Sequence, residues 1–209
     1  MLRLVKNVLR PYPYTFHQIR HNYIFIHVPK AAGTTMLASL GSKGQRIHLN
    51  WRVYQQANPS LFEKAFKFTV VRNPISRLES AYRYLCLGGS GFKPDAVLGE
   101  FINKNFTTFD DFVFNYLTPC QMATHNLFRP QVFFLCDAMG NVKVDRVIKQ
   151  EELSQQYQSL RSTLKFMEPE LRAHNVTKLE PRRVSRETAA RIQELYSMDF
   201  LTFSYQSVC

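Results

Sequence analysis

The stretch Y-I-F-I-H-V-P-K-A-A-G-T-T-M, residues 23–36, decides the fold. It begins with an apolar run rich in β-branched and aromatic residues, which predicts a buried strand over residues 23–28. A turn follows at residues 29–35, with a lysine, two alanines, a glycine and two threonines, and a helix-like pattern comes next. A strand, a turn and a helix start in this order present backbone N–H groups, hydroxyls and a positive charge, all of which can bind an anion. The turn therefore predicts a binding place for a phosphate-like group.

A second strand-to-helix junction lies at residues 68–82, F-T-V-V-R-N-P-I-S-R-L-E-S-A-Y. Arg72 stands at the predicted carboxyl end of the strand, and Asn73, followed by a proline, is a typical helix cap. Ser76 and Ser80 are four positions apart, so they share one face of the predicted helix. An arginine can bind a phosphate through two parallel hydrogen bonds. Two such junctions in one chain favour a single ligand with two anionic ends over two unrelated structural turns.

The remaining chain alternates short apolar runs with helical patterns. Further strands are expected at residues 46–49, 66–71 and 144–148, with 131–136 as a less regular candidate. Helices are expected at residues 34–40, 74–87, 108–116, 151–164 and 185–198, the last capped by Ser185, and residues 88–99 are expected to form an exposed loop. This alternation is typical of an α/β protein with a parallel sheet. We expect one domain over residues 23–209, with a central parallel sheet flanked by helices and a P-loop-like turn, after a basic and apolar extension over residues 1–22.

Charge and cysteine usage limit the partners and the compartment. The chain has 209 residues and a net charge of +11, which predicts an anionic partner. No apolar run reaches the roughly 18–20 residues that span a bilayer, so we expect at most weak association with a membrane surface, through residues 1–10. The four cysteines lack metal-ligand spacing and fit a reduced compartment, with buried thiols favoured over a Cys120–Cys136 bridge. We expect no metal site.

Both junctions resemble a known family. V-P-K-A-A-G-T-T, residues 28–35, is similar to the 5′-phosphosulfate loop of sulfotransferases, and residues 68–84 are similar to their 3′-phosphate motif. The segments at residues 125–136, 144–153 and 195–205 resemble the membrane-associated carbohydrate sulfotransferases. The resemblance covers nearly all of the chain from residue 23 onward. It is closest to the branch that includes the heparan 2-O- and chondroitin/dermatan sulfotransferases.

This resemblance implies a sulfotransferase fold and transfer of a sulfuryl group from 3′-phosphoadenosine 5′-phosphosulfate to a hydroxyl of an acidic or neutral glycan, without a metal. Lys30 would meet the phosphosulfate and its bridging oxygen. Arg72 and Ser80 would hold the 3′-phosphate. The residues expected to bind the 5′-phosphate are those that follow the lysine in the turn, namely Ala31, Ala32, Gly33, Thr34 and Thr35, with the glycine allowing the backbone to approach the ligand.

The acceptor hydroxyl must lose a proton, and histidine is the usual base near neutral pH. Of the six histidines, we prefer His48 because its place before the Arg72 motif resembles that of the family's base. His125 is the alternative base, although we expect it to bind the acceptor together with Arg129. His27 falls in the first strand and is expected to be buried. The basic cluster at residues 174–183 either closes over the donor, meets an acidic glycan or is a solvated run of charges.

Other functions stay open at this point. The acceptor is alternatively a tyrosine, a lipid or a small alcohol. A P-loop kinase-like protein is a second class, although the lysine precedes the glycine here and follows it in the P-loop consensus. A polyanion-binding module is a third, but the cations lie at strand ends and no nucleic-acid motif is present, so we expect no nucleic-acid partner. We expect a cytoplasmic enzyme, or a membrane-associated or Golgi-type one if an anchor is missing from this sequence.

Overall fold

The computed structural model describes residues 12–41, 47–89, 91–171 and 184–206. The chain divides into two compact units, each built from two segments. The first unit comprises Met1–Val71 and Gln131–Thr177, and the second comprises Arg72–Pro130 and Lys178–Cys209. The expectations for residues 1–10, for Arg46, for the basic cluster at residues 174–183 and for Cys209 lie outside the described residues.

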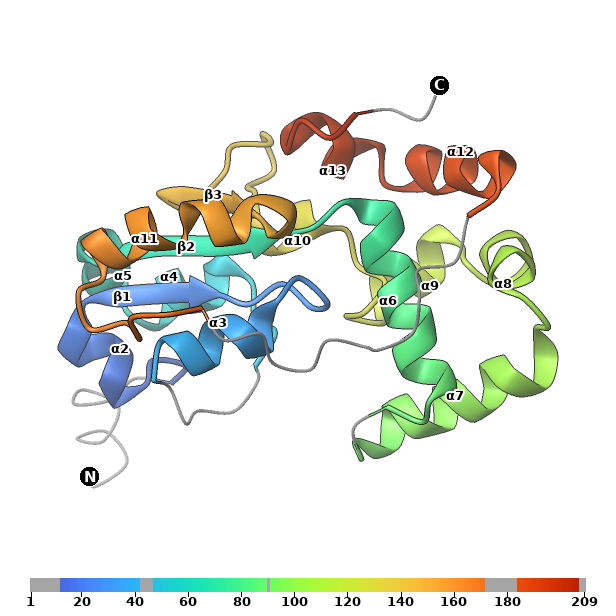
Figure 1. Ribbon diagram of the computed structural model, residues 1–209, viewed down its shortest axis with the longest axis horizontal. Coiled ribbons are helices and arrows are strands. Elements are labelled where there is room, and N and C mark those ends of the chain that lie inside the picture. Colours follow the sequence, from blue (N-terminus) through green and yellow to red (C-terminus); the bar gives the residue numbers. More distant parts are fainter. Residues whose placement is uncertain (1–11, 42–46, 90, 172–183, 207–209) are drawn as a thin grey trace. The chain divides into compact units, whose positions relative to one another are not determined.

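The first unit holds a three-stranded parallel sheet with the order β1 (Tyr23–Ile26), β2 (Phe66–Val71) and β3 (Arg146–Lys149), so that β2 is central (Figure 1). The register pairs Ile26 with Thr69, whose buried hydroxyl also donates a hydrogen bond to the Ile26 carbonyl oxygen at 2.8 Å. Strand β1 is buried throughout, as parallel strands covered on both faces usually are. The predicted α/β class with a central parallel sheet is confirmed.

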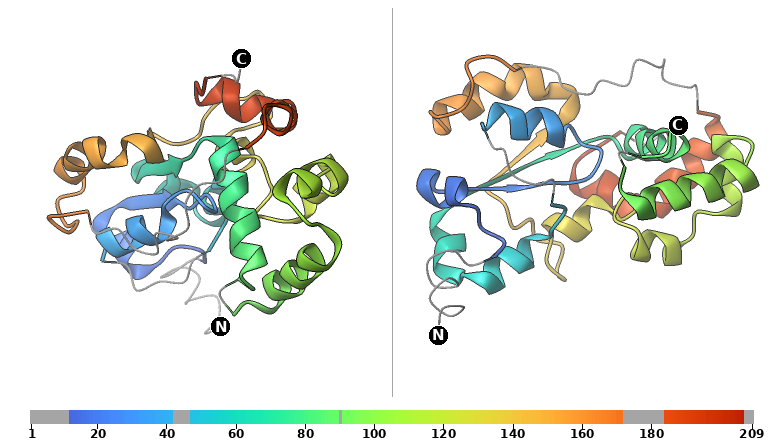
Figure 2. Two further views of the ribbon diagram at one scale, coloured as in Figure 1. Left: turned by 45° about the vertical axis from the view of Figure 1, so that its right-hand side comes forward. Right: turned by 90° about the horizontal axis from the view of Figure 1, so that it is seen from below.

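Helices cover both faces of this sheet (Figure 2). They are α2 (Phe16–His21), α3 (Gly33–Ser39), α4 (Trp51–Ala57), α5 (Pro59–Lys64), α10 (Gln131–Leu135), the 3-10 turn η1 (Gln150–Glu152) and α11 (Leu153–Thr163). Helices α3 and α11 share one buried apolar cluster with Phe25 and Phe68 of the sheet. Helices α4 and α5 lie on the opposite face, where the Lys67 ammonium donates hydrogen bonds to the carbonyl oxygens of Phe62 and Ala65.

The described part of the second unit is helical. Its helices are α6 (Pro74–Cys86), α7 (Lys93–Asn105), α8 (Phe109–Asn115), α9 (Pro119–Thr124), α12 (Arg186–Leu195) and α13 (Ser197–Thr202). One buried apolar cluster takes side chains from all six. Both predicted caps are confirmed, since the Asn73 side chain accepts hydrogen bonds from the first turn of α6 and the Ser185 hydroxyl accepts one from the Thr188 N–H.

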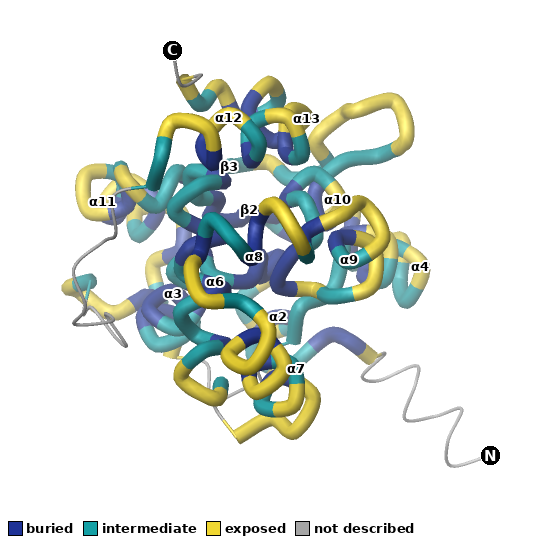
Figure 3. Tube along the Cα trace, turned by 90° about the vertical axis from the view of Figure 1, so that its right-hand side faces the viewer, coloured by how far each residue is buried: buried dark blue, intermediate teal, exposed yellow. Residues whose placement is uncertain are grey.

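Helix α7 replaces much of the loop predicted at residues 88–99, so that prediction is wrong. It buries a narrow stripe of Asp95, Gly99 and Ile102 and exposes most of its other side chains (Figure 3). A Cβ built on Gly99 would lie 2.1 Å from the Leu85 carbonyl oxygen of α6. The glycine therefore serves close packing of two helices, and the proline near the helix start fits a first-turn position, where its missing N–H costs nothing.

Other predicted elements differ from the structure. Residues 47–49 form no strand and lead instead into α4, and residues 131–135 form helix α10 where a strand was a candidate. Several short helices, α2, α4, α5, α9 and α13, were not predicted because six or seven residues hold too few turns to establish a helical period. The described cysteines are thiols, as predicted, but Cys120 is exposed and the expected burial is wrong. Across the described ranges, no helix is both long and apolar enough to cross a bilayer.

Candidate active site

The turn after β1 has an unusual backbone. Lys30 and Ala32 both adopt left-handed conformations, with φ of 65° and 53°. For a residue with a Cβ this conformation costs on the order of 1–3 kcal/mol, and such costs concentrate at binding sites. Ala32 is also the N-cap of α3 and provides no side-chain hydrogen bond to the helix. Left-handed residues within a turn can aim successive N–H groups into a concavity that suits an anion.

Exposure alternates along the turn. The half-buried residues are Lys30, Ala32 and Thr34, whereas the buried ones are Ala31, Gly33 and Thr35. The predicted phosphate-binding residues therefore divide into two groups. The half-buried group can present side chains to a ligand, and the buried group contributes mainly backbone.

Gly33 is required by a neighbouring side chain. A Cβ built at this position would lie 1.6 Å from Nε2 of His27, which is inside the imidazole ring. The backbone of Gly33 is not left-handed, so freedom of φ does not explain the glycine. The His27 ring, which is 7% exposed and buried as predicted, thus occupies the space of the missing side chain. The His27 ring therefore makes a close approach to Gly33 that a side chain would prevent, and the predicted contact of Gly33 with a ligand stays a prediction.

His27 also contacts His48. The Nδ1 atom of His48 lies 3.1 Å from the His27 carbonyl oxygen, and the two ring centroids are 4.3 Å apart. A carbonyl oxygen can only accept, so Nδ1 of His48 carries the proton and the lone pair of the neutral ring is on Nε2. His48 is half-buried. The structure therefore brings the predicted base and the predicted donor-binding turn together, with His27 between them.

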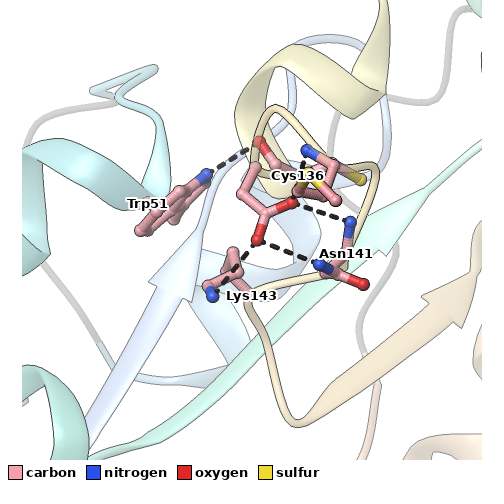
Figure 4. Close-up of polar contacts among 6 residues, drawn as sticks. Trp51, Cys136, Asn141 and Lys143 are labelled. Carbon is pink, nitrogen blue, oxygen red and sulfur yellow. Dashed lines mark hydrogen bonds and ion pairs between the residues drawn. The ribbon is translucent and has the colours of Figure 1, made fainter.

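The segment that carries His48 is anchored again at Trp51. The indole N–H donates a hydrogen bond of 3.0 Å to the Cys136 carbonyl oxygen (Figure 4). The loop after Cys136 folds around Asp137, whose carboxylate accepts hydrogen bonds from Asn141 and Lys143. The Asn141 backbone N–H is the main cause that lowers the pKa of Asp137. Sequence reasoning gave Trp51 no role, because nothing in the sequence pairs it with a residue so far along the chain.

Arg72 and Ser80 belong to the second junction. Arg72 is half-buried and directly follows β2, and Ser80 is half-buried on α6, one turn after Ser76. Because β1 and β2 are parallel neighbours, both motifs begin directly after carboxyl ends at one edge of the sheet. Ligands of open α/β sheets bind outside the carboxyl ends of the strands.

His125 has both ring nitrogens directed at protein groups. Its Nδ1 accepts a hydrogen bond from the Leu127 N–H at 3.3 Å, and its Nε2 lies 3.6 Å from a carboxylate oxygen of Asp95. The other oxygen of Asp95 accepts a 2.9 Å hydrogen bond from the Tyr84 hydroxyl. Burial is the main cause that lowers the pKa of His125, and Asp95 opposes the shift. The Arg129 guanidinium donates hydrogen bonds of 2.9 and 2.7 Å to the last turn of α9.

Two side chains that sequence reasoning left without a role hold the segment between His125 and Arg129. Arg77 is fully buried and donates hydrogen bonds to the carbonyl oxygens of Leu127, at 3.3 Å, and Arg129, at 2.7 Å. The Tyr196 hydroxyl donates one of 2.6 Å to the carbonyl oxygen of Phe128. Three successive carbonyl groups are thus fixed. The signal was present in the sequence, since Arg77 belongs to the second motif, but its direction could not be inferred.

The sheet and the turn first define a class, the α/β proteins in which a buried parallel strand leads through an anion-binding type of turn into a helix. A model of the Sulfotransferase family matches residues 14–206, and this chain belongs to that family. The match confirms the family predicted from the two motifs and supports sulfuryl transfer as the chemistry. No curated protein and no solved structure gave a significant match. Within the described ranges, no three His, Cys, Asp or Glu side chains gather as a metal site would require.

Proposed function

We propose that this chain transfers the sulfuryl group of 3′-phosphoadenosine 5′-phosphosulfate to a hydroxyl of a glycan. The observation that carries the proposal is the pair of motifs that follow two neighbouring parallel strands, one with Lys30 and one with Arg72. Family membership supports sulfuryl transfer in general. The donor and the acceptor are our additions to it.

The two motifs suit the two ends of this donor. Lys30 is proposed to contact the phosphosulfate, and residues 31–35 the 5′-phosphate, which the left-handed turn and the start of α3 favour. Arg72 and Ser80 are proposed to bind the 3′-phosphate. A nucleoside triphosphate has no 3′-phosphate, so this assignment favours the sulfuryl donor over ATP.

The proposed reaction is a direct displacement at sulfur. The acceptor oxygen forms a bond to sulfur, the bond between sulfur and the bridging oxygen breaks, and the charge moves onto the 5′-phosphate. The Lys30 ammonium stabilises that charge, as cations do in phosphoryl transfer. The acceptor proton moves to Nε2 of His48.

The proton position on each ring favours His48 over His125 as the base. Nδ1 of His48 donates to a backbone carbonyl oxygen, so the lone pair that can take a proton is on Nε2. In His125 the lone pair on Nδ1 already accepts a backbone N–H, and Nε2 is directed at Asp95. His125 and Arg129 are instead proposed to bind the acceptor, and the hydrogen bonds to the carbonyl groups of residues 127–129 hold the backbone of that segment in place.

The test is a transfer assay with labelled donor, the purified chain and a panel of acidic and neutral polysaccharides, phenols, alcohols and tyrosine peptides. We expect label in a glycan. Lys30→Ala should lower turnover about 10²–10³-fold, because it removes a group that stabilises charge in the transition state. Lys104→Ala, which replaces an exposed lysine of α7, is the matched control and should act like the wild type.

Two results would contradict the proposal in different ways. Transfer to phenols, alcohols or peptides with none to any glycan would keep the chemistry and replace the acceptor. In calorimetry, tighter binding of ATP than of 3′-phosphoadenosine 5′-phosphate would contradict the proposed donor. It would also contradict the proposed roles of Arg72 and Ser80 in binding a 3′-phosphate.

A further inference from the structure

The His27 side chain lies between two parts of the candidate active site. It is nearly buried, its ring fills the space beside Gly33, and its carbonyl oxygen accepts a hydrogen bond from Nδ1 of His48. The ring is stacked on Phe25, with centroids 5.6 Å apart and planes at 19°. One residue therefore contacts the sheet, the turn and the segment of the predicted base.

The contact between Gly33 and the His27 ring is too close for a side chain at residue 33 to be added without movement of one of them. The 1.6 Å between a Cβ placed on Gly33 and Nε2 of His27 is less than half of an ordinary contact. Any side chain at residue 33 must push away either the imidazole or the turn. Because the ring is also stacked on Phe25, which opposes its movement, displacement of the turn is the expected result.

The contact with His48 fixes which nitrogen of His48 carries the proton and where its ring lies. The hydrogen bond to the His27 carbonyl oxygen selects the tautomer of His48, and the His27 ring packs against the His48 ring at 4.3 Å. A base that acts in a displacement must be held close to its productive place, because a misplacement of about 1 Å can cost about 10²-fold in rate. The His27 ring provides a rigid surface for this purpose.

We propose that His27 is a positioning residue for sulfuryl transfer, which sets the donor-binding turn and His48 in one geometry. This inference rests on the proposed function for its catalytic meaning. The contact itself is a property of the fold, so the two can fail separately. Sequence reasoning treated His27 only as a buried strand residue.

The first test is a double-substitution cycle read by calorimetry with 3′-phosphoadenosine 5′-phosphate. Gly33→Ala should weaken binding about tenfold or more, because the new methyl displaces the turn. Adding His27→Ala to it should recover part of that loss, since the ring that the methyl meets is gone while the support that the ring gives to the turn is lost as well. A double variant that binds no better than Gly33→Ala alone overturns the proposal.

Gly99→Ala is the matched control. Its new Cβ meets the backbone carbonyl oxygen of Leu85, so removal of the His27 ring should give no recovery there. The stabilities of the same single and double variants are also compared by thermal unfolding, without any ligand. If the wild type neither binds the nucleotide nor transfers sulfate, the proposed function fails, and recovery of stability in the Gly33→Ala, His27→Ala variant still decides whether the contact exists.

The second test separates positioning from mere stability. In His27→Ala, and in His27→Asn as a smaller change, we expect a folded protein with turnover lowered about tenfold or more at saturating donor. Nitrogen-15 spectra should show His48 as the Nδ1–H tautomer in the wild type; the backbone carbonyl oxygen of residue 27 is retained in the variants, so a tautomer mixture there reports that the His48 ring has moved away from it once the His27 ring is gone. Wild-type turnover together with an unchanged tautomer in a folded variant would overturn the role of His27.

Discussion

Lys30 and Ala32 show how a few residues set the character of the turn. Both have a left-handed backbone conformation, which residues with a side chain rarely adopt. A glycine at either position would avoid the strain. Glycine is instead used at residue 33, where the His27 ring needs the space. Strain retained at two positions of one turn is typical of sites that bind a ligand.

At the same scale, the two candidate bases lead to a prediction. His48→Ala should bind 3′-phosphoadenosine 5′-phosphate normally and lose turnover about 10²–10⁴-fold, because it removes the group that takes the acceptor proton. His125→Ala is expected to raise the apparent KM for the acceptor with less effect on kcat. Steady-state kinetics with the acceptor found by the transfer assay measure both. If His125→Ala loses kcat and His48→Ala retains it, the assignment of the base is wrong.

At the scale of elements, the pairing of α6 with α7 depends on one small residue. Gly99 lies on the buried stripe of α7, so close to α6 that a Cβ at this position would lie 2.1 Å from the Leu85 carbonyl oxygen. Elsewhere in the second unit, Arg77 and Tyr196 fix the carbonyl groups of an irregular segment by direct hydrogen bonds. Close backbone packing restrains α7 against α6, and the satisfied carbonyl groups restrain the segment between the proposed acceptor residues.

Gly99→Ala tests the helix pairing through the sign of its effect. An exposed glycine in a helix would gain about 1 kcal/mol of stability on replacement by alanine. Here the added methyl meets the Leu85 carbonyl oxygen, so we expect a loss of about 1–3 kcal/mol in the free energy of unfolding. Val97→Ala on the exposed face of α7 is the control, and urea unfolding measures both. A more stable Gly99→Ala variant would show that α6 and α7 do not pack this closely.

At the scale of the molecule, one half-buried histidine in each unit makes stability depend on pH. Burial lowers the pKa of His17, and His21 and Arg20 lower it further. Burial is also the main cause of the lowered pKa of His125. His17 shares a 2.9 Å hydrogen bond with the Tyr23 hydroxyl. Because the folded chain resists protonation at these rings, the unfolded chain binds more protons below the usual histidine pKa of 6.5.

The midpoint of urea unfolding should therefore fall as the pH drops from about 7.5 to about 5, and level off below the folded pKa values. His17→Gln and His125→Gln should each make that fall smaller. Asp137→Asn is the control. The pKa of this carboxylate is lowered from 3.8, so its contribution to the stability of the fold is lost only in stronger acid. A midpoint that stays constant or rises over this range would contradict the assignment.

The sequence by itself determined the α/β class, the first two strands, the caps at Asn73 and Ser185 and the family. Each of these depends on neighbours in the chain: a run of β-branched residues, a polar cap before a helix, or a motif read as a continuous string. Helices of six or seven residues and the helix at α7 escaped prediction, because short elements lack periodicity and Gly99 looks like a loop residue until α6 lies beside it.

The tertiary structure decided what depends on distant pairs. It placed the His48 ring against His27, directed the Nδ1–H of His48 at the His27 carbonyl oxygen and joined Trp51 to Cys136 by a hydrogen bond. It also placed the His27 imidazole in the space beside Gly33 that a side chain would occupy. No local pattern encodes these contacts, since each joins residues that meet only after the sheet and its covering helices have packed.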